Sequence, residues 1–212
     1  MSNSLRKRLK KLPTGALHSF FFVVVFAFLY FVYMIVSLLV LIYDYPFYQW
    51  MESVSTSTLF GSHIALNYIG FVTPFVISLT LLILLFVTGK VNLNRKYTSL
   101  MILLLVLDTL FSLFVFEPRI ITSSGGGPNL PAMVIVILYV AYLAFSDSTR
   151  EGFFLSYILG YVIGAISDIE SITHATRNTT FGGGGFMDVD FVFPLIIFIS
   201  YWMEHYFAMK HR

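Results

Sequence analysis

The chain has 212 residues, of which 58% are hydrophobic and only 11% are charged. One soluble core of this size cannot hide so much apolar surface, so the composition excludes an ordinary soluble protein and indicates a membrane protein. The chain contains no cysteine, which excludes disulfides, thiolate metal sites and cysteine nucleophiles. The net charge of +2 is small and the basic residues cluster at loop positions, so we expect lipid and not nucleic acid as the partner.

Apolar runs of about twenty residues recur along the chain, which is the length that a helix needs to cross a hydrocarbon core of about 30 Å. We therefore predict an all-α fold, a polytopic transmembrane bundle of about six helices with glycine-rich outer loops. The predicted spans are Ser19 to Tyr43, a helix within Leu59 to Thr88, Thr98 to Phe116, Pro131 to Phe145, Phe153 to Ser167 and Phe191 to Phe207.

These spans define one transmembrane domain over residues 19–209, between a basic segment of residues 1–18 and a short tail of residues 210–212. In the basic segment, Leu5, Leu9 and Leu12 share one helical face among lysines and arginines. This pattern indicates either a short helix lying on anionic lipid or a plain signal for a cytoplasmic N-terminus.

The second apolar stretch is longer than one span needs. Gly61, His63, Asn67 and Pro74 interrupt its first half. We therefore expect a short re-entrant or interfacial piece before the full helix, within residues 59–70.

Basic residues are distributed unevenly between the two predicted sides. With a cytoplasmic N-terminus, only Arg119 and Arg177 fall outside the cytoplasm. The others are Arg6, Lys7, Arg8, Lys10, Lys11, Lys90, Arg95, Lys96, Arg150, Lys210 and Arg212. Because this asymmetry was not used to choose the spans, it independently predicts a multi-pass protein of the cell membrane with both termini in the cytoplasm.

Three glycine-bearing stretches fall on the predicted outer side, each just before an apolar segment. They are Gly61-Ser62, Gly125 to Gly127 and Gly182 to Gly185. Either their backbones converge on a re-entrant or ligand-binding feature, or they are flexible loops that link helices. The candidate backbone positions are Gly61, Gly126, Gly127, Gly183 and Gly185.

An acidic group lies beside the last glycine stretch. Its members are Asp168, Glu170, His174, Asp188 and Asp190. Oxygen ligands of this kind suit a divalent cation, although the spacings match no standard metal loop and solvated loop carboxylates are the alternative. The sequence identifies no cofactor.

Asp168 also ends a stripe of small residues on the fifth span, because Ser156, Gly160 and Gly164 precede it at intervals of four. Such a stripe is typical of close helix contacts, so we expect Asp168 to face the interior of the bundle.

Asp108 lies in the middle of the third span, where an ionised side chain costs at least about 2.5 kcal/mol. No Lys or Arg lies within a predicted span to neutralise it. We expect it to be protonated, hydrogen-bonded to hydroxyls such as Ser112, or a transient ion or proton site.

Two further features carry alternatives. Near the inner end of the last span, Tyr201 with His205 and Ser200 with Glu204 are four-residue pairs, either hydrogen-bonded steps or ordinary interfacial residues. Asn178 begins an N-glycosylation sequon in a loop assigned to the outside, although such triplets also arise by chance.

Four segments in matching order resemble a prokaryotic membrane family known as domain of unknown function 1614. A Ser-Leu-Leu-Gly-Ser-like segment is similar to residues 57–62, and Gly-Gly followed by Pro is similar to residues 126–131. Gly-Ala-Asp resembles Gly164-Ala165, with two residues intervening before Asp168, and Gly-Gly-Ala-Gly-x-Phe-Asp is echoed by residues 182–188. The family's function is unassigned, so this resemblance implies a membrane fold and no activity.

A second resemblance is to intramembrane aspartyl proteases of the Gly-x-Gly-Asp type, which use two membrane aspartates. Asp168 with Asp188 or Asp190 would form such a dyad and share one proton. Met187 and Val189 stand where the family has the glycine before its aspartate.

Three functions follow from these residues. The first is an outward-facing site that binds or translocates a cation or small solute, with Asp108 as a deeper station and a homodimer as the assembly. The second is the intramembrane protease. The third is a non-catalytic subunit or assembly factor, which would leave the carboxylates apart and exposed.

Overall fold

The computed structural model describes residues 14–43, 46–47, 50, 56–58, 64–88, 94–114, 129–145, 150–174 and 179–210. The N-terminal segment expected to lie on lipid, Gly61, Gly126, Gly127 and Asn178 fall outside these residues, as does the side chain of His174.

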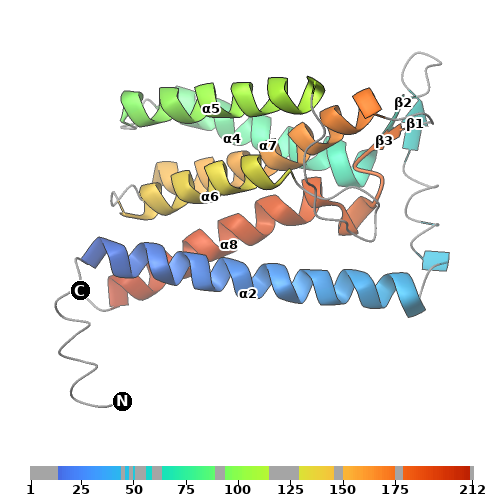
Figure 1. Ribbon diagram of the computed structural model, residues 1–212. Coiled ribbons are helices and arrows are strands. Elements are labelled where there is room, and N and C mark those ends of the chain that lie inside the picture. Colours follow the sequence, from blue (N-terminus) through green and yellow to red (C-terminus); the bar gives the residue numbers. More distant parts are fainter. Residues whose placement is uncertain are drawn as a thin grey trace.

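Within these described residues, six long helices run back and forth between two ends of a bundle (Figure 1). They are α2 (Thr14–Tyr43), α4 (Thr73–Thr88), α5 (Arg95–Phe114), α6 (Leu130–Phe145), α7 (Arg150–His174) and α8 (Val189–Lys210). In the described chain, four helical segments are long and apolar enough to cross a membrane: Phe20–Val40, Tyr68–Thr88, Arg95–Phe114 and Gly152–Glu170. The helix of residues 130–144 is apolar but shorter. The predicted all-α transmembrane bundle is thus confirmed.

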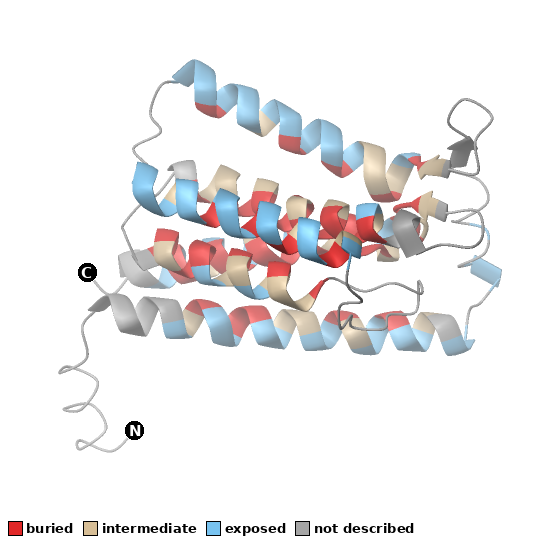
Figure 2. Ribbon diagram, turned by 45° about the horizontal axis from the view of Figure 1, so that its top comes forward, coloured by how far each residue is buried: buried red, intermediate tan, exposed pale blue. Residues whose placement is uncertain are grey.

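Exposed residues, pale blue in Figure 2, occupy the outward faces of the helices, and many of them are large and apolar. On α5, for example, the buried residues form one narrow stripe of Met101, Leu105, Asp108 and Ser112, and its other leucines and valines are mostly exposed. A surface this apolar is stable in contact with lipid and not with water, which explains why so few residues are buried although the chain is so hydrophobic.

The main core lies where α2, α6, α7 and α8 meet. Phe22 of α2, Val136 of α6, Ile163 of α7 and Ile197 of α8 are fully buried there and belong to one cluster. Phe193 adds edge-to-face contacts with aromatic rings of α2. This core holds α7 and α8 side by side and so fixes the positions of the acidic residues that they carry.

A small three-stranded sheet closes the end of the bundle at which α4, α6 and α8 begin (Figure 1). It contains β1 (Thr56–Thr58), β2 (Ile64–Asn67) and β3 (Thr179–Phe181), with β2 antiparallel to β1 and parallel to β3. We call this end the sheet end and the opposite one, where α5 and α7 begin and α8 ends, the basic end.

Strand β2 lies in the stretch for which the sequence predicts a re-entrant or interfacial piece. The described part of residues 59–70 is strand β2 followed by a π-helical turn, Tyr68–Val72, which continues directly into α4. Asn67 begins this turn, and its side-chain oxygen accepts hydrogen bonds from the backbone N–H groups of Ile69 and Gly70, each at 2.9 Å. Asn67 therefore marks a helix cap, and residues 64–72 do not form a re-entrant helix, whereas Gly61 and His63 lie outside the described residues.

Candidate functional site

The stripe of small residues on α7 packs directly against α8, as the sequence predicts. A Cβ atom on Gly160 would lie 2.5 Å from the Cα atom of Pro194, and one on Gly164 would lie 2.8 Å from the Cα atom of Asp190. Gly152, which the predicted stripe did not include, extends it by one turn and faces the Tyr201 hydroxyl. The missing side chains let the two helices approach closely, and at Gly164 the space is filled by the Asp190 carboxyl.

Asp168 and Asp190 form a carboxyl pair between these two helices, in which Asp190 is buried and Asp168 is half-buried. The Asp190 side chain is fully buried, and neither of its oxygens has a hydrogen-bond donor among the described residues. The Asp168 carboxyl lies within hydrogen-bonding reach of it. Two ionised carboxylates would repel each other at this separation, whereas one shared proton would turn the contact into a hydrogen bond.

The surroundings of Asp190, which precedes the predicted span from Phe191, favour the protonated form. Burial raises the pKa of Asp190 well above its usual value of 3.8, and the charges of Asp168 and Asp188 raise it further. Tyr161 of α7 lies close enough to both carboxyls of the pair to interact with them, and as a neutral phenol it does not offset these effects. The raised pKa favours a protonated Asp190 at pH values at which an exposed carboxyl would be ionised.

Asp188 has a different role, because its oxygens receive backbone hydrogen bonds. One oxygen accepts from the N–H of Gly184 at 2.9 Å and the other from the N–H of Asp190 at 3.0 Å. Burial raises the pKa of Asp188, and these hydrogen bonds oppose that effect. Asp188 therefore caps the start of α8, and Asp190 is the aspartate that contacts Asp168.

The glycine loop of residues 182–185 covers the pair. The Gly182 N–H donates a 2.8 Å hydrogen bond to Asp168 Oδ2. Gly182 has a φ of 65° and Gly185 one of 57°, a left-handed conformation that favours glycine. Gly182 also lies so close to Gly70, before α4, that a Cβ on either would overlap the other's backbone. The last glycine stretch thus contacts a carboxylate and a helix start, whereas the two stretches expected to converge on it lie outside the described residues.

A second polar cluster lies between α5, α6 and α7. The buried Asn129 side chain donates to Glu170 Oε1 at 2.8 Å and to Ser112 Oγ at 3.0 Å, and its oxygen accepts from the N–H of Ala132. Asp108 is buried one turn from Ser112 on the same stripe of α5. Glu170 and Asp108 therefore face the bundle interior as expected for functional carboxylates, but Glu170 belongs to this cluster and not to the Asp168–Asp190 pair.

Replacing Asn129 with alanine is expected to lower the free energy of unfolding by about 3 kcal/mol, because Glu170 would lose a donor in a buried place. Chemical denaturation in detergent measures this. Thr80→Ala is a suitable control, since its exposed hydroxyl bonds only the Val76 carbonyl, and it should cost less than about 0.5 kcal/mol. Equal effects of the two substitutions would contradict the role given to Asn129.

The polar residues near the end of α8 are buried. Tyr201 contacts His205, as one alternative expected, but Ser200 and Glu204 bond to other residues. His205 Nδ1 pairs with Glu204 Oε2, and the rings of His205 and Tyr201 stack with centroids 4.4 Å apart. The Ser200 hydroxyl donates to the Ile196 carbonyl at 2.7 Å. Because Glu204 is only 1% exposed, these are not ordinary interfacial residues.

The geometry does not favour a metal site. Within the described ranges, no group of three or more His, Asp or Glu side chains is placed to hold a metal ion. The acidic residues instead lie in three places. Asp168 contacts Asp190, Asp188 caps α8, and Glu170 belongs to the second polar cluster.

Comparison of the chain with family models, with curated proteins and with solved structures finds no match. The resemblances to the membrane family and to the proteases therefore stay predictions. The class of protein that the fold defines is a helical membrane protein, and its function has to be inferred from the site.

Proposed function

We propose that this membrane protein binds and releases a proton at the Asp168–Asp190 pair and uses that step to translocate a cation or small solute. The observation that carries the proposal is the contact between the fully buried Asp190 carboxyl and the half-buried Asp168 carboxyl, between α7 and α8. Burying a carboxyl of this kind in a membrane protein costs free energy, and such residues are usually functional.

A proton fits the pair better than a metal ion does. A protein site for a divalent cation usually brings several ligating side chains together, and the described residues contain no group of three or more His, Asp or Glu placed to hold one. A proton requires only the two carboxyls, and its binding removes the repulsion between them. The cation expected from the sequence is thus, in this proposal, a proton.

The glycine loop supplies a means of coupling. Loss of the proton would leave two adjacent charges under a loop whose Gly182 N–H bonds one of them. Repulsion would then favour a state in which the loop and the start of α8 move apart, and protonation would favour the closed state. Asp108 and the Glu204–His205 pair are the further buried groups available to a proton pathway.

The proposed orientation places both termini in the cytoplasm and the glycine loop on the outer side. Arg95, Lys96, Arg150 and Lys210 occupy the first or last turns of helices at the basic end, which supports a cytoplasmic position for that end. A homodimer in the cell membrane is part of the proposal, because one protomer is small for a transporter.

Proton flux into proteoliposomes, followed with a trapped pH-sensitive dye under a valinomycin-clamped potassium gradient, tests the proposal. We expect flux with the native protein and none with Asp168→Asn or Asp190→Asn. Asp188→Asn should retain flux, because asparagine also caps a helix. The proposal fails if the native protein carries no proton, or if flux survives in the first two variants.

The second candidate is an intramembrane aspartyl protease, and the same contact favours it. Two carboxyls sharing a proton on neighbouring helices are what such a dyad requires. Incubation with a membrane-spanning peptide separates the candidates: the protease requires cleavage that both Asp168→Asn and Asp190→Asn abolish, and an intact peptide excludes it for that substrate. The third candidate, an assembly factor, loses support because Asp168, Asp188 and Asp190 are neither apart nor fully exposed.

A further inference from the structure

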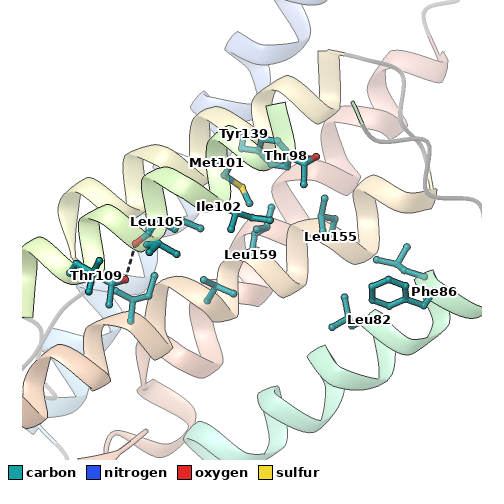
Figure 3. A pocket seen from close by; sticks show the side chains of 15 residues that line it. Leu82, Phe86, Thr98, Met101, Ile102, Leu105, Thr109, Tyr139, Leu155 and Leu159 are labelled. Carbon is teal, nitrogen blue, oxygen red and sulfur yellow. Dashed lines mark hydrogen bonds between the residues drawn. The ribbon is translucent and has the colours of Figure 1, made fainter. Parts of the chain in front are cut away.

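An apolar cavity of about 800 Å³ lies between α4 and α5, and residues of α7 also line it (Figure 3). Both helices pack on α7, and the cavity separates them. Leu82 and Phe86 line it from α4, Ile102 and Leu105 from α5, and Leu159 from α7. Leu82, Phe86 and Ile102 are exposed, so the cavity is open on the face that the bundle turns to lipid.

The length of the cavity fits one leaflet of a bilayer. Its lining on α5 extends from Thr98 to Leu110, and twelve residues of helix rise roughly 18 Å. Half of a hydrocarbon core of about 30 Å is about 15 Å. An acyl chain entering at the basic end would therefore fill the cavity over the full depth of that leaflet.

The entrance carries positive charge and hydroxyl groups. Arg95 and Lys96 are exposed in the first turn of α5, immediately before the Thr98 hydroxyl, which lies 2.6 Å from that of Tyr139. The N-terminus of a helix adds partial positive charge at the same place. These groups are complementary to a phosphate next to an apolar chain.

We propose that the cavity binds an anionic phospholipid, with an acyl chain between α4 and α5 and its phosphate beside Arg95 and Lys96. The site is independent of the Asp168–Asp190 pair, because the cavity lining on α7 and the face of α7 toward α8 are different sides of that helix. Anionic lipids are concentrated in the cytoplasmic leaflet, which agrees with the proposed orientation.

Native mass spectrometry of the protein released from nanodiscs tests this, with equal amounts of phosphatidylglycerol and phosphatidylcholine. We expect phosphatidylglycerol to be retained preferentially, and Arg95→Gln with Lys96→Gln to weaken that retention about tenfold. Lys210→Gln is the matched control, because this lysine lies in the last turn of α8 at the same end of the bundle, and it should change little.

Filling the cavity tests the acyl chain separately. Leu82→Trp and Ile102→Trp change exposed lining residues and should fold normally, yet each should reduce retention of both lipids. Equal retention of the two lipids by the native protein, or equal losses in Lys210→Gln and the double variant, would overturn the proposal. A change of oligomeric mass without loss of lipid in the tryptophan variants would also overturn it, because the occupant would then be a second copy of the chain.

Discussion

Replacing Gly164 with valine is expected to lower the free energy of unfolding by about 3 kcal/mol. Any Cβ at this position overlaps Asp190 Oδ1 and lies 2.8 Å from the Asp190 Cα atom, which the α8 backbone cannot easily vacate. The branched side chain would force α7 and α8 apart at the carboxyl pair. Denaturation of the purified protein in detergent, followed by circular dichroism, measures the loss.

Gly183→Ala is the control for this substitution. A Cβ on Gly183 meets nothing closer than the Thr180 carbonyl oxygen at 3.3 Å, so the cost should stay within about 1 kcal/mol. If Gly164→Val proved as mild as Gly183→Ala, the close packing of the two helices at the carboxyl pair would be refuted.

The second large effect concerns pH. Because the folded-state pKa of Asp190 is raised, the stability that its proton contributes is fully present below the usual carboxyl pKa of 3.8 and is lost as the pH rises through the raised value. One proton changes stability by about 1.4 kcal/mol per pH unit over that window. Asp190→Asn should remove this slope and make the variant more stable than the native protein at high pH, since an amide donates to Asp168 at every pH. Thermal unfolding as a function of pH measures both.

Asp168→Asn provides the matched test of a shared proton. If the two carboxyls hold one proton between them, either substitution removes the same titration, and the double variant should show no further change. Two independent and additive losses would mean that the carboxyls titrate separately, and the pair would then not be the proton site.

Local patterns in the sequence were sufficient to predict the bundle. Apolar runs of membrane-spanning length predicted six helices, and the helices of the structure differ from them mainly by extending further at their ends. The interval of four residues from Ser156 to Asp168 correctly placed the small stripe inside the bundle, because helical periodicity alone decides which residues share a face. The cost of an ionised carboxylate in lipid indicated Asp108 as a candidate site residue, and the structure adds that it is buried.

The partners of these residues could not be predicted in the same way. Asp188 and Asp190 are equally near Asp168 in the sequence, and only the turn before α8 decides that one caps the helix and the other meets Asp168. The contact of Asn129 with Glu170 joins residues 41 positions apart. Its only sequence signal was an asparagine between a glycine run and a proline. Contacts of this kind depend on tertiary packing, which residue spacing does not encode.

The hydrogen bond from Gly182 to Asp168 joins two residues that are synthesised at different times. Asp168 is synthesised and placed in α7 before its backbone donor, before β3 and before Asp190. Until the chain beyond α7 is in place, the Asp168 carboxyl lacks its Gly182 donor and β2 lacks its parallel neighbour β3. Truncation before residue 190 would therefore remove the contact between Asp168 and Asp190, although all of α7 lies upstream of the cut.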